Sequence, residues 1–147
     1  MNRYLILLIF ITSSIFGETI HRGKVVEANN SMVVTRHFLA TEIGNNVLQN
    51  GGNAIDASIA ISFALAVVLP QAGNIGGGGF MVIHNQDSNF TIDYREQAPL
   101  LATEKMFITD GLYDPELALE SYQSSGTPGA VAGMYLAHQE FGSIKWK

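Results

Sequence analysis

The chain has 147 residues, of which 47% are hydrophobic and 14% are charged, a balance typical of one globular domain and unlike that of a disordered chain. Eight Lys and Arg stand against thirteen Asp and Glu, the formal net charge is −5, and the few bases are scattered. Nucleic acid is therefore not expected as a partner, because phosphates are bound by clustered Lys and Arg. Cysteine is absent, which excludes disulfides, thiolate metal sites and a Cys nucleophile.

Residues 1–17 have the pattern of a secretory signal peptide. Arg3 precedes a stretch of 13 mostly apolar residues, 4–16, and the small Gly17 follows. This stretch falls short of the roughly 20 residues that a membrane-spanning helix needs, which favours cleavage and export over a membrane anchor. Cleavage after Gly17 removes one base, Arg3, and no acid, so the net charge moves from −5 to −6. We expect an exported protein, periplasmic or secreted, whose mature domain spans residues 18–147.

The mature chain is expected to begin with a strand at residues 27–35 that enters a turn. A helix at residues 40–49 follows, with Ile43, Val47 and Leu48 on one face. The sequence NGGNA ends this helix, because glycines adopt the left-handed conformation after a helix without a side-chain clash.

A second helix is expected at residues 54–69, closed by Pro70. It is apolar almost all round, and its only polar members are Asp56, Ser58 and Ser62. A helix of this composition is usually covered by protein, so we expect it to be buried on every side.

A β-hairpin is expected after a cluster of glycines. A short apolar strand at residues 80–84 is followed by the turn sequence NQDSN and by a second strand at residues 90–95. Apolar and polar residues alternate along the second strand, which predicts one apolar face and one polar face that carries Arg95.

The last expected element is an apolar helix that ends at Phe141, before Gly142. Thr127 is expected as its N-cap and Pro128 in its first turn. Helices and strands alternate along the chain, which supports a layered α/β or α+β fold.

Four consecutive glycines, Gly76 to Gly79, raise the possibility of a phosphate-binding loop. Such loops follow a strand and open a helix, whereas these glycines follow a helix and open a strand. Neither G-x-G-x-x-G nor G-x-x-x-x-G-K-[ST] is present. A run of four glycines indicates instead that another segment or a ligand lies directly against the backbone, where any Cβ would collide.

Arg95 is the candidate for substrate binding. A planar guanidinium on a polar strand face can hold a carboxylate through two parallel hydrogen bonds. The competing interpretation is a structural ion pair with Asp93 or Glu96. Other polar residues offer no recognisable site: the histidines lack metal-ligand spacing and the serines lack a G-x-S-x-G context. These residues are His21, His37, His84, His138, Ser58, Ser62, Ser124 and Ser125.

Three long motifs, taken together and in this order, resemble the N-terminal part of the γ-glutamyltransferase family, also called glutathione hydrolase. They are NGGNAIDASIAISFALAVVLPQAGNIGGGGFMVIH, DYREQAP and SGTPGAVAGMYLAHQEFG, and the similarity runs from about residue 24 to the end of the chain. The resemblance implies an α+β fold of the N-terminal nucleophile hydrolase type, with two central sheets between helical layers. It also implies a precursor that cuts itself into a large and a small subunit.

The resemblance further implies how the family acts. A Thr at the start of the small subunit attacks the γ-glutamyl amide of glutathione or a related compound, and the acyl-enzyme passes to water or an amine acceptor. Arg95 matches the arginine that holds the α-carboxylate of the γ-glutamyl group. The glycine run is then a scaffold beside the pocket. No cofactor and no metal is implied.

The sequence stops within what corresponds to the large subunit, so no catalytic residue is expected in this chain, which we expect to be inactive alone. The expected partner is the small subunit of the same precursor, and without it apolar surface is expected to stay uncovered around residues 54–69. Two alternatives remain open. One is another member of the superfamily, such as a cephalosporin acylase or a polyglutamate-processing enzyme. The other is an exported module without catalytic activity.

Overall fold

The chain divides into two units, residues 1–30 and 31–147, and the computed structural model describes residues 25–86 and 88–146. The predicted signal peptide, residues 1–17, lies outside the described residues. The strand predicted at residues 27–35 is wrong, because this segment forms neither helix nor strand. A strand needs a neighbour for its backbone hydrogen bonds, and no segment within the described ranges pairs with this one.

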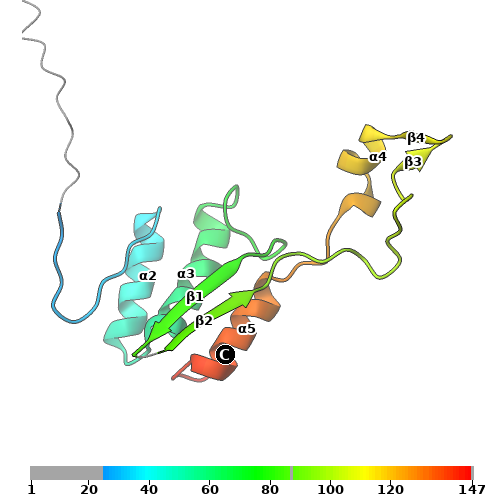
Figure 1. Ribbon diagram of the computed structural model, residues 1–147. Helices are drawn as coiled ribbons and strands as arrows, with labels where there is room; N and C mark the ends of the chain where they lie inside the picture. Colours follow the sequence, from blue (N-terminus) through cyan, green and yellow to red (C-terminus); the bar gives the residue numbers. More distant parts are fainter. Residues whose placement is uncertain (1–24, 87, 147) are drawn as a thin grey trace, which may run out of the picture. The chain divides into compact units, whose positions relative to one another are not determined.

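The first two predicted helices are confirmed. Helix α2 spans Phe38–Gln49 and helix α3 spans Ala54–Val68, and the two pack against each other (Figure 1). The predicted glycine stop is present, since Gly51 has φ +90° and the Gly52 N–H donates to the carbonyl of Val47 at 3.0 Å. Within the described part of the chain, no helix combines the length and apolarity needed to cross a membrane.

Helix α3 is not covered on all sides, so the prediction that it is buried all round is wrong. Ala57 and Ile59 are buried, but Phe63 is 37% exposed and Val67 is 78% exposed. Among the described elements, α2 and α5 are its packing partners, and they leave the face that carries Phe63 and Val67 exposed. The uncovered apolar surface expected in this region is confirmed.

The predicted hairpin is formed by β1, Phe80–Asn85, and β2, Ser88–Asp93, which pair antiparallel with Phe80 opposite Asp93. The pairing continues past the strands, because the Tyr94 N–H donates to the Gly79 carbonyl at 2.9 Å. Strand β2 begins two residues earlier than predicted and ends before Arg95, so Arg95 lies just beyond the strand.

A second, smaller hairpin and a short helix lie at residues that the sequence analysis left without structure. Strands β3, Ile108–Thr109, and β4, Leu112–Tyr113, are joined by Asp110 and Gly111, whose φ angles are both positive at 52° and 80°. Positive φ at both central residues is the pattern of a type I′ hairpin turn, for which Asp-Gly is a favoured pair. Helix α4, Pro115–Glu120, and the 3₁₀ turn η1, Tyr122–Ser124, follow.

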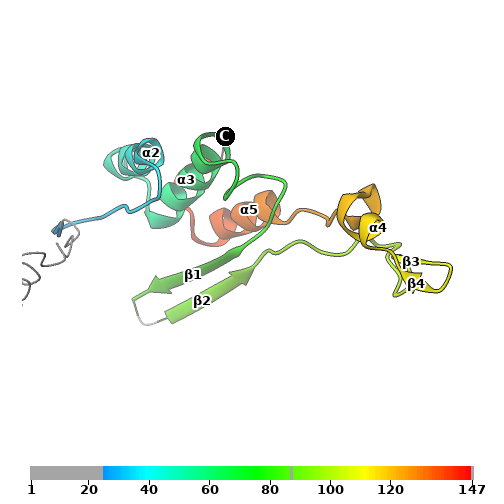
Figure 2. The ribbon, with the colours of Figure 1, turned by 90° about the horizontal axis from the view of Figure 1, so that it is seen from above.

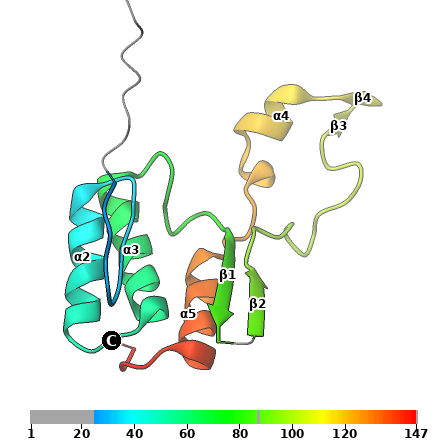
Figure 3. The same cartoon turned by 60° about the vertical axis from the view of Figure 1, so that its left-hand side comes forward.

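Helix α5, Ala130–Phe141, completes the core and ends before Gly142 as predicted. Its residues Ala130 and Met134 pack with Ile59 of α3. In Figure 2 the helices α2, α3 and α5 lie on one side of the β1–β2 hairpin, and Figure 3 shows α5 between α3 and the hairpin. Among the helices of the described residues, α5 is the one that packs against β2, while α2 and α3 pack behind it. Helices and antiparallel hairpins are thus both present in residues 31–146, an α+β arrangement.

The start of α5 differs from the prediction. Thr127 is not its N-cap, because its backbone forms a bridge with Gln97 through hydrogen bonds of 3.1 and 2.8 Å. This pairing holds Thr127 and Pro128 outside the helix, and Gly129 takes the N-cap position without a side-chain hydrogen bond. The local capping pattern was overridden by a contact with a segment 30 residues earlier in the chain.

Candidate functional site

Arg95 follows β2 at the point where the chain leaves the hairpin, and its side chain is 63% exposed. Its guanidinium pairs side-on with the carboxylate of Asp93, with Nε 3.1 Å from Oδ1 and Nη2 2.9 Å from Oδ2. The ion pair that the sequence allowed is thus present with Asp93. It occupies one edge of the guanidinium, and Nη1 makes no hydrogen bond to any residue that the structure describes.

The two charges stabilise each other in their ionised forms. Hydrogen bonds from the Arg95 side chain, and then from its backbone N–H, lower the pKa of Asp93 from its ordinary value. The same side-chain hydrogen bond, followed by the charge of Asp93, raises the pKa of Arg95. A guanidinium and a carboxylate are therefore both charged here at neutral pH.

The ring of Phe80 further restricts the guanidinium. The Arg95 Cζ lies 4.9 Å from the centroid of this ring, within the range of a cation–π contact. Phe80 is the first residue of β1 and faces Asp93 across the hairpin, so strand pairing sets the positions of both groups that touch the guanidinium.

The glycine run packs against the backbone that carries Arg95. A Cβ on Gly78 would lie 2.6 Å from both the Arg95 Cα and the Tyr94 carbonyl oxygen. The carbonyl of Gly77 accepts hydrogen bonds from the N–H groups of Gly129 and Ala130, at 3.1 and 2.9 Å. The free N–H groups at the start of α5 are thus used internally, which agrees with a scaffold role for the run and not with a phosphate loop.

The beginning of α5 closes on the other side of the same segment. A Cβ on Gly129 would overlap the Tyr94 carbonyl oxygen, and one on Gly133 would overlap the Tyr94 side chain. Tyr94 and Arg95 are therefore held between the glycine run and α5, with glycine on both sides because no side chain fits.

A hollow of about 280 Å³ opens beside this segment. Its polar lining includes Asp93, Arg95, Gln97 and Thr127, and Pro128 and Leu136 are among its apolar residues. The hollow thus contains one cation and one anion that pair with each other, so a ligand carboxylate here must use the donors of Arg95 that Asp93 leaves.

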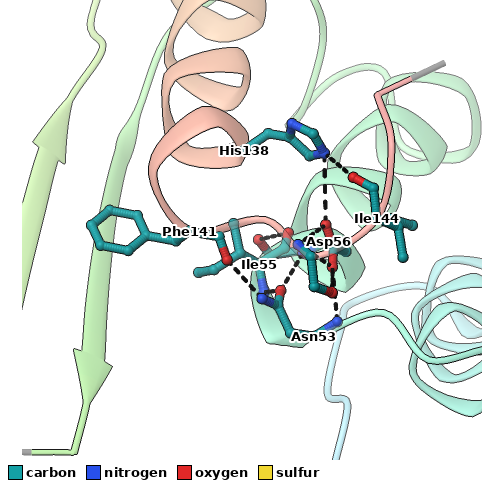
Figure 4. Close-up of polar contacts among 8 residues, drawn as sticks. Asn53, Ile55, Asp56, His138, Phe141 and Ile144 are labelled. Carbon is teal, nitrogen blue, oxygen red and sulfur yellow. Dashed lines mark hydrogen bonds and ion pairs between the residues drawn. The ribbon is translucent and has the colours of Figure 1, made fainter.

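A second polar cluster, which the sequence analysis missed, joins the start of α3 to the chain after α5 (Figure 4). The carboxylate of Asp56 is buried and accepts hydrogen bonds from the Asn53 N–H at 2.8 Å and from the Ser143 hydroxyl at 2.6 Å. Asn53 in turn caps α3 and donates from Nδ2 to the Phe141 carbonyl at 2.6 Å. The local signal was present as the capping-box spacing of Asn53 and Asp56.

Burial of Asp56 acts to raise its pKa, but the hydrogen bonds from Ser143, Asn53 and Ile144 together bring the pKa below its ordinary value. His138 lies nearby, with Nε2 3.8 Å from Asp56 Oδ1 and 2.7 Å from the Ile144 carbonyl oxygen. The Ser143 hydroxyl donates to Asp56 and not to His138, so these side chains do not form a nucleophile–base pair. The cluster fastens α3 to α5.

The fold and these motifs define the class of protein. Residues 40–147, more than half of the chain, match the family model described as gamma-glutamyltranspeptidase. The chain belongs to the gamma-glutamyltranspeptidase family, and its α+β fold is that of an N-terminal nucleophile hydrolase, as the resemblance implied.

Individual relatives agree with this assignment. The glutathione hydrolase proenzyme of Escherichia coli strain K12 is 49% identical over 121 residues, which cover 81% of this chain and 21% of that protein. The crystal structure of Helicobacter pylori gamma-glutamyltranspeptidase superposes with a TM-score of 0.77 at 48% identity, over 83% of this chain and 36% of that one. The crystal structure of the Bacillus anthracis transpeptidase enzyme CapD superposes with a TM-score of 0.63 at 37% identity, and the match covers 80% of this chain and 35% of that one. The chain thus spans about a fifth of the length of the curated relatives it matches.

Proposed function

We propose that this chain supplies part of the donor site of an enzyme that cleaves the γ-glutamyl amide of glutathione and related compounds. The γ-glutamyl group passes to water or to an amino acid or peptide acceptor. Membership of the family and the names of the relatives, glutathione hydrolase proenzymes, support this activity. The observation that carries it within the chain is Arg95, a charged guanidinium with an open edge beside a hollow.

Arg95 is proposed to bind the α-carboxylate of the γ-glutamyl group. Asp93 occupies the edge formed by Nε and Nη2, so the edge formed by Nη1 and Nη2 is the one that can receive two oxygens of a ligand carboxylate. Such a pair fixes both the position and the rotation of the carboxylate, which places the γ-carbonyl at a defined distance from it.

The chemical step is proposed to use a Thr from the part of the family's length that this chain does not span. Its hydroxyl oxygen attacks the γ-carbonyl, the C–N bond breaks, and the amine leaves with a proton, which gives an ester. Water or an amine then attacks the ester and the Thr hydroxyl is regenerated. The small subunit of the same precursor is the proposed source of this Thr and the proposed partner of this chain.

Export is proposed as well, to the periplasm or the medium, with residues 1–17 as the cleaved signal peptide. The support is the pattern of one base, an apolar stretch and a small residue at the cleavage position.

The test uses a chimeric precursor in which residues 18–147 replace the matching segment of the Escherichia coli relative. Glutathione hydrolysis by this protein supports the activity, and a folded chimera that processes itself yet releases no glutamate contradicts it. In the completed enzyme, Arg95→Ala leaves the substrate carboxylate without its partner. If the site is shielded from water there, the loss of binding free energy is about 2 to 5 kcal/mol. This loss is a decrease of roughly thirty-fold to a few thousand-fold in kcat/KM.

Two variants sharpen this test. Arg95→Lys keeps the charge but loses the planar fork, so it is expected to recover only part of the activity. Arg36→Ala is the matched control, because Arg36 is exposed and makes no ion pair or side-chain hydrogen bond within the described ranges. If Arg95→Ala lowers the yield of processed enzyme but leaves KM near that of the parent, Arg95 serves only the ion pair with Asp93.

A further inference from the structure

We infer that Asp93 is a positioning residue for the donor site: it fixes the guanidinium of Arg95 so that one defined edge faces the substrate carboxylate. This inference rests on the proposed function of Arg95 and assigns a role to a second residue. It depends on three observations about Asp93, namely how it grips the guanidinium, what holds it in place, and how little it contributes to the stability of the fold.

The grip of Asp93 is side-on and selective. Its two oxygens contact Nε and Nη2, at 3.1 Å for Nε to Oδ1, 3.3 Å for Nε to Oδ2 and 2.9 Å for Nη2 to Oδ2. A guanidinium has five N–H donors, and this arrangement uses the side edge while it leaves both hydrogens of Nη1 and one of Nη2. One hydrogen of Nη1 and the remaining hydrogen of Nη2 form the end edge, which suits a second carboxylate in a bidentate pair.

The carboxylate of Asp93 is itself anchored independently of the guanidinium. Its Oδ1 accepts a hydrogen bond from the backbone N–H of Arg95 at 3.1 Å, and Asp93 is the last residue of β2, paired with Phe80. The backbone of the next two residues is enclosed by the glycine run and by α5. A carboxylate held in this way stays in place when a ligand arrives, so it acts as a fixed support for Arg95 and not as a competitor that must leave.

The pair contributes little to holding the fold together. The side chains of Arg95 and Asp93 are 63% and 49% exposed, and exposed ion pairs stabilise proteins weakly. The pair does line the hollow described above. A side-on ion pair beside a hollow, with little structural value, is better explained by control of the orientation of Arg95 than by stability.

The proposed role can be separated from a structural role in the chimeric precursor with a γ-glutamyl anilide as the donor. Asp93→Asn removes the charge and one acceptor, so the guanidinium samples more orientations. We expect KM to rise about five- to thirty-fold while kcat changes less than about threefold. Asp93→Glu keeps the charge but moves the carboxylate, so it should restore part of the lost affinity. Glu42→Gln on the exposed face of α2 is the control for loss of one negative charge.

A double-mutant cycle gives the decisive readout. If Asp93 acts through Arg95, Asp93→Asn has no further effect on KM in the Arg95→Ala background. The inference is overturned if KM falls on Asp93→Asn, which makes Asp93 a competitor, if KM stays unchanged, or if the effect is equal in both backgrounds. These failures differ from failure of the proposed function, in which Arg95→Ala itself leaves kcat/KM unchanged.

Discussion

The polar cluster at the start of α3 allows a quantitative prediction of the stability that Asp56→Ala removes. The carboxylate satisfies the Asn53 N–H, which is part of the capping box, and also the N–H and hydroxyl of Ser143. Loss of a capping interaction costs about 1 kcal/mol, and a buried donor left without a partner costs about 1 to 3 kcal/mol. Ser143 is exposed, so water can replace the partner of one of its two donors, and we count the loss of only one of them. With the capping interaction, the expected total is about 2 to 4 kcal/mol.

Native-state hydrogen exchange measures this loss locally. In the chimeric precursor, amides of α3 and of α5 should exchange about thirty- to seven-hundred-fold faster in Asp56→Ala, since 1.4 kcal/mol corresponds to a factor of ten. Amides of β1 and β2 should change less, because neither strand makes a hydrogen bond to Asp56 within the described residues, although Phe90 of β2 packs on Phe141. Glu140→Ala on the exposed face of α5 is the control. A change below about threefold in α3, or an equal change in every segment, would refute the assignment of Asp56 as the link between α3 and α5.

The remaining predictions concern pH, packing and export. The folded-state pKa of Asp56 lies below the unfolded value of about 3.9, so the stability that its carboxylate gives the fold is present above that value and is lost as the pH falls through the folded pKa. Hydrogen exchange of the α3 amides should therefore depend less on pH in this range in Asp56→Asn than in the parent. Gly78→Ala places a Cβ 2.6 Å from backbone atoms, so it should lower the yield of processed enzyme far more than Gly73→Ala, whose Cβ would have ordinary contacts, and equal yields on a gel would contradict the packing argument. Export should remove residues 1–17, so mass spectrometry of the exported protein should show a new N-terminus close to residue 18, and an intact Met1 would contradict this.

Elements with strong local signals were predictable from the sequence. The helical periodicity of α2 and the Gly51–Gly52 stop located this helix to within two residues of its start, and the apolar run gave α3 almost to the residue. The D-G turn between β3 and β4 carried an equally local signal, and it was overlooked because the flanking strands are only two residues long.

Long-range pairing explains what the sequence did not reveal. Thr127 has the residue type of an N-cap, yet its backbone pairs with Gln97, and the strand predicted at residues 27–35 has no described partner. The Asp56–Ser143 contact joins residues 87 positions apart, which no local pattern indicates. The sequence predicts Arg95 and Asp93 on one strand face, two residues apart, so their pairing was among the predicted alternatives. The open edge of the guanidinium emerged only from the geometry.

The most direct test of the central claim, that Arg95 binds the α-carboxylate of the donor, removes the carboxylate from the substrate as well as the arginine from the protein. In the chimeric precursor, kcat/KM is measured for a γ-glutamyl anilide and for the 4-aminobutyryl anilide, which lacks only the carboxylate, with the parent and with Arg95→Ala. The account predicts that Arg95→Ala lowers kcat/KM for the γ-glutamyl donor by roughly thirty-fold to a few thousand-fold, and that it has little effect on the donor without a carboxylate. An equal loss for both donors would contradict the claim.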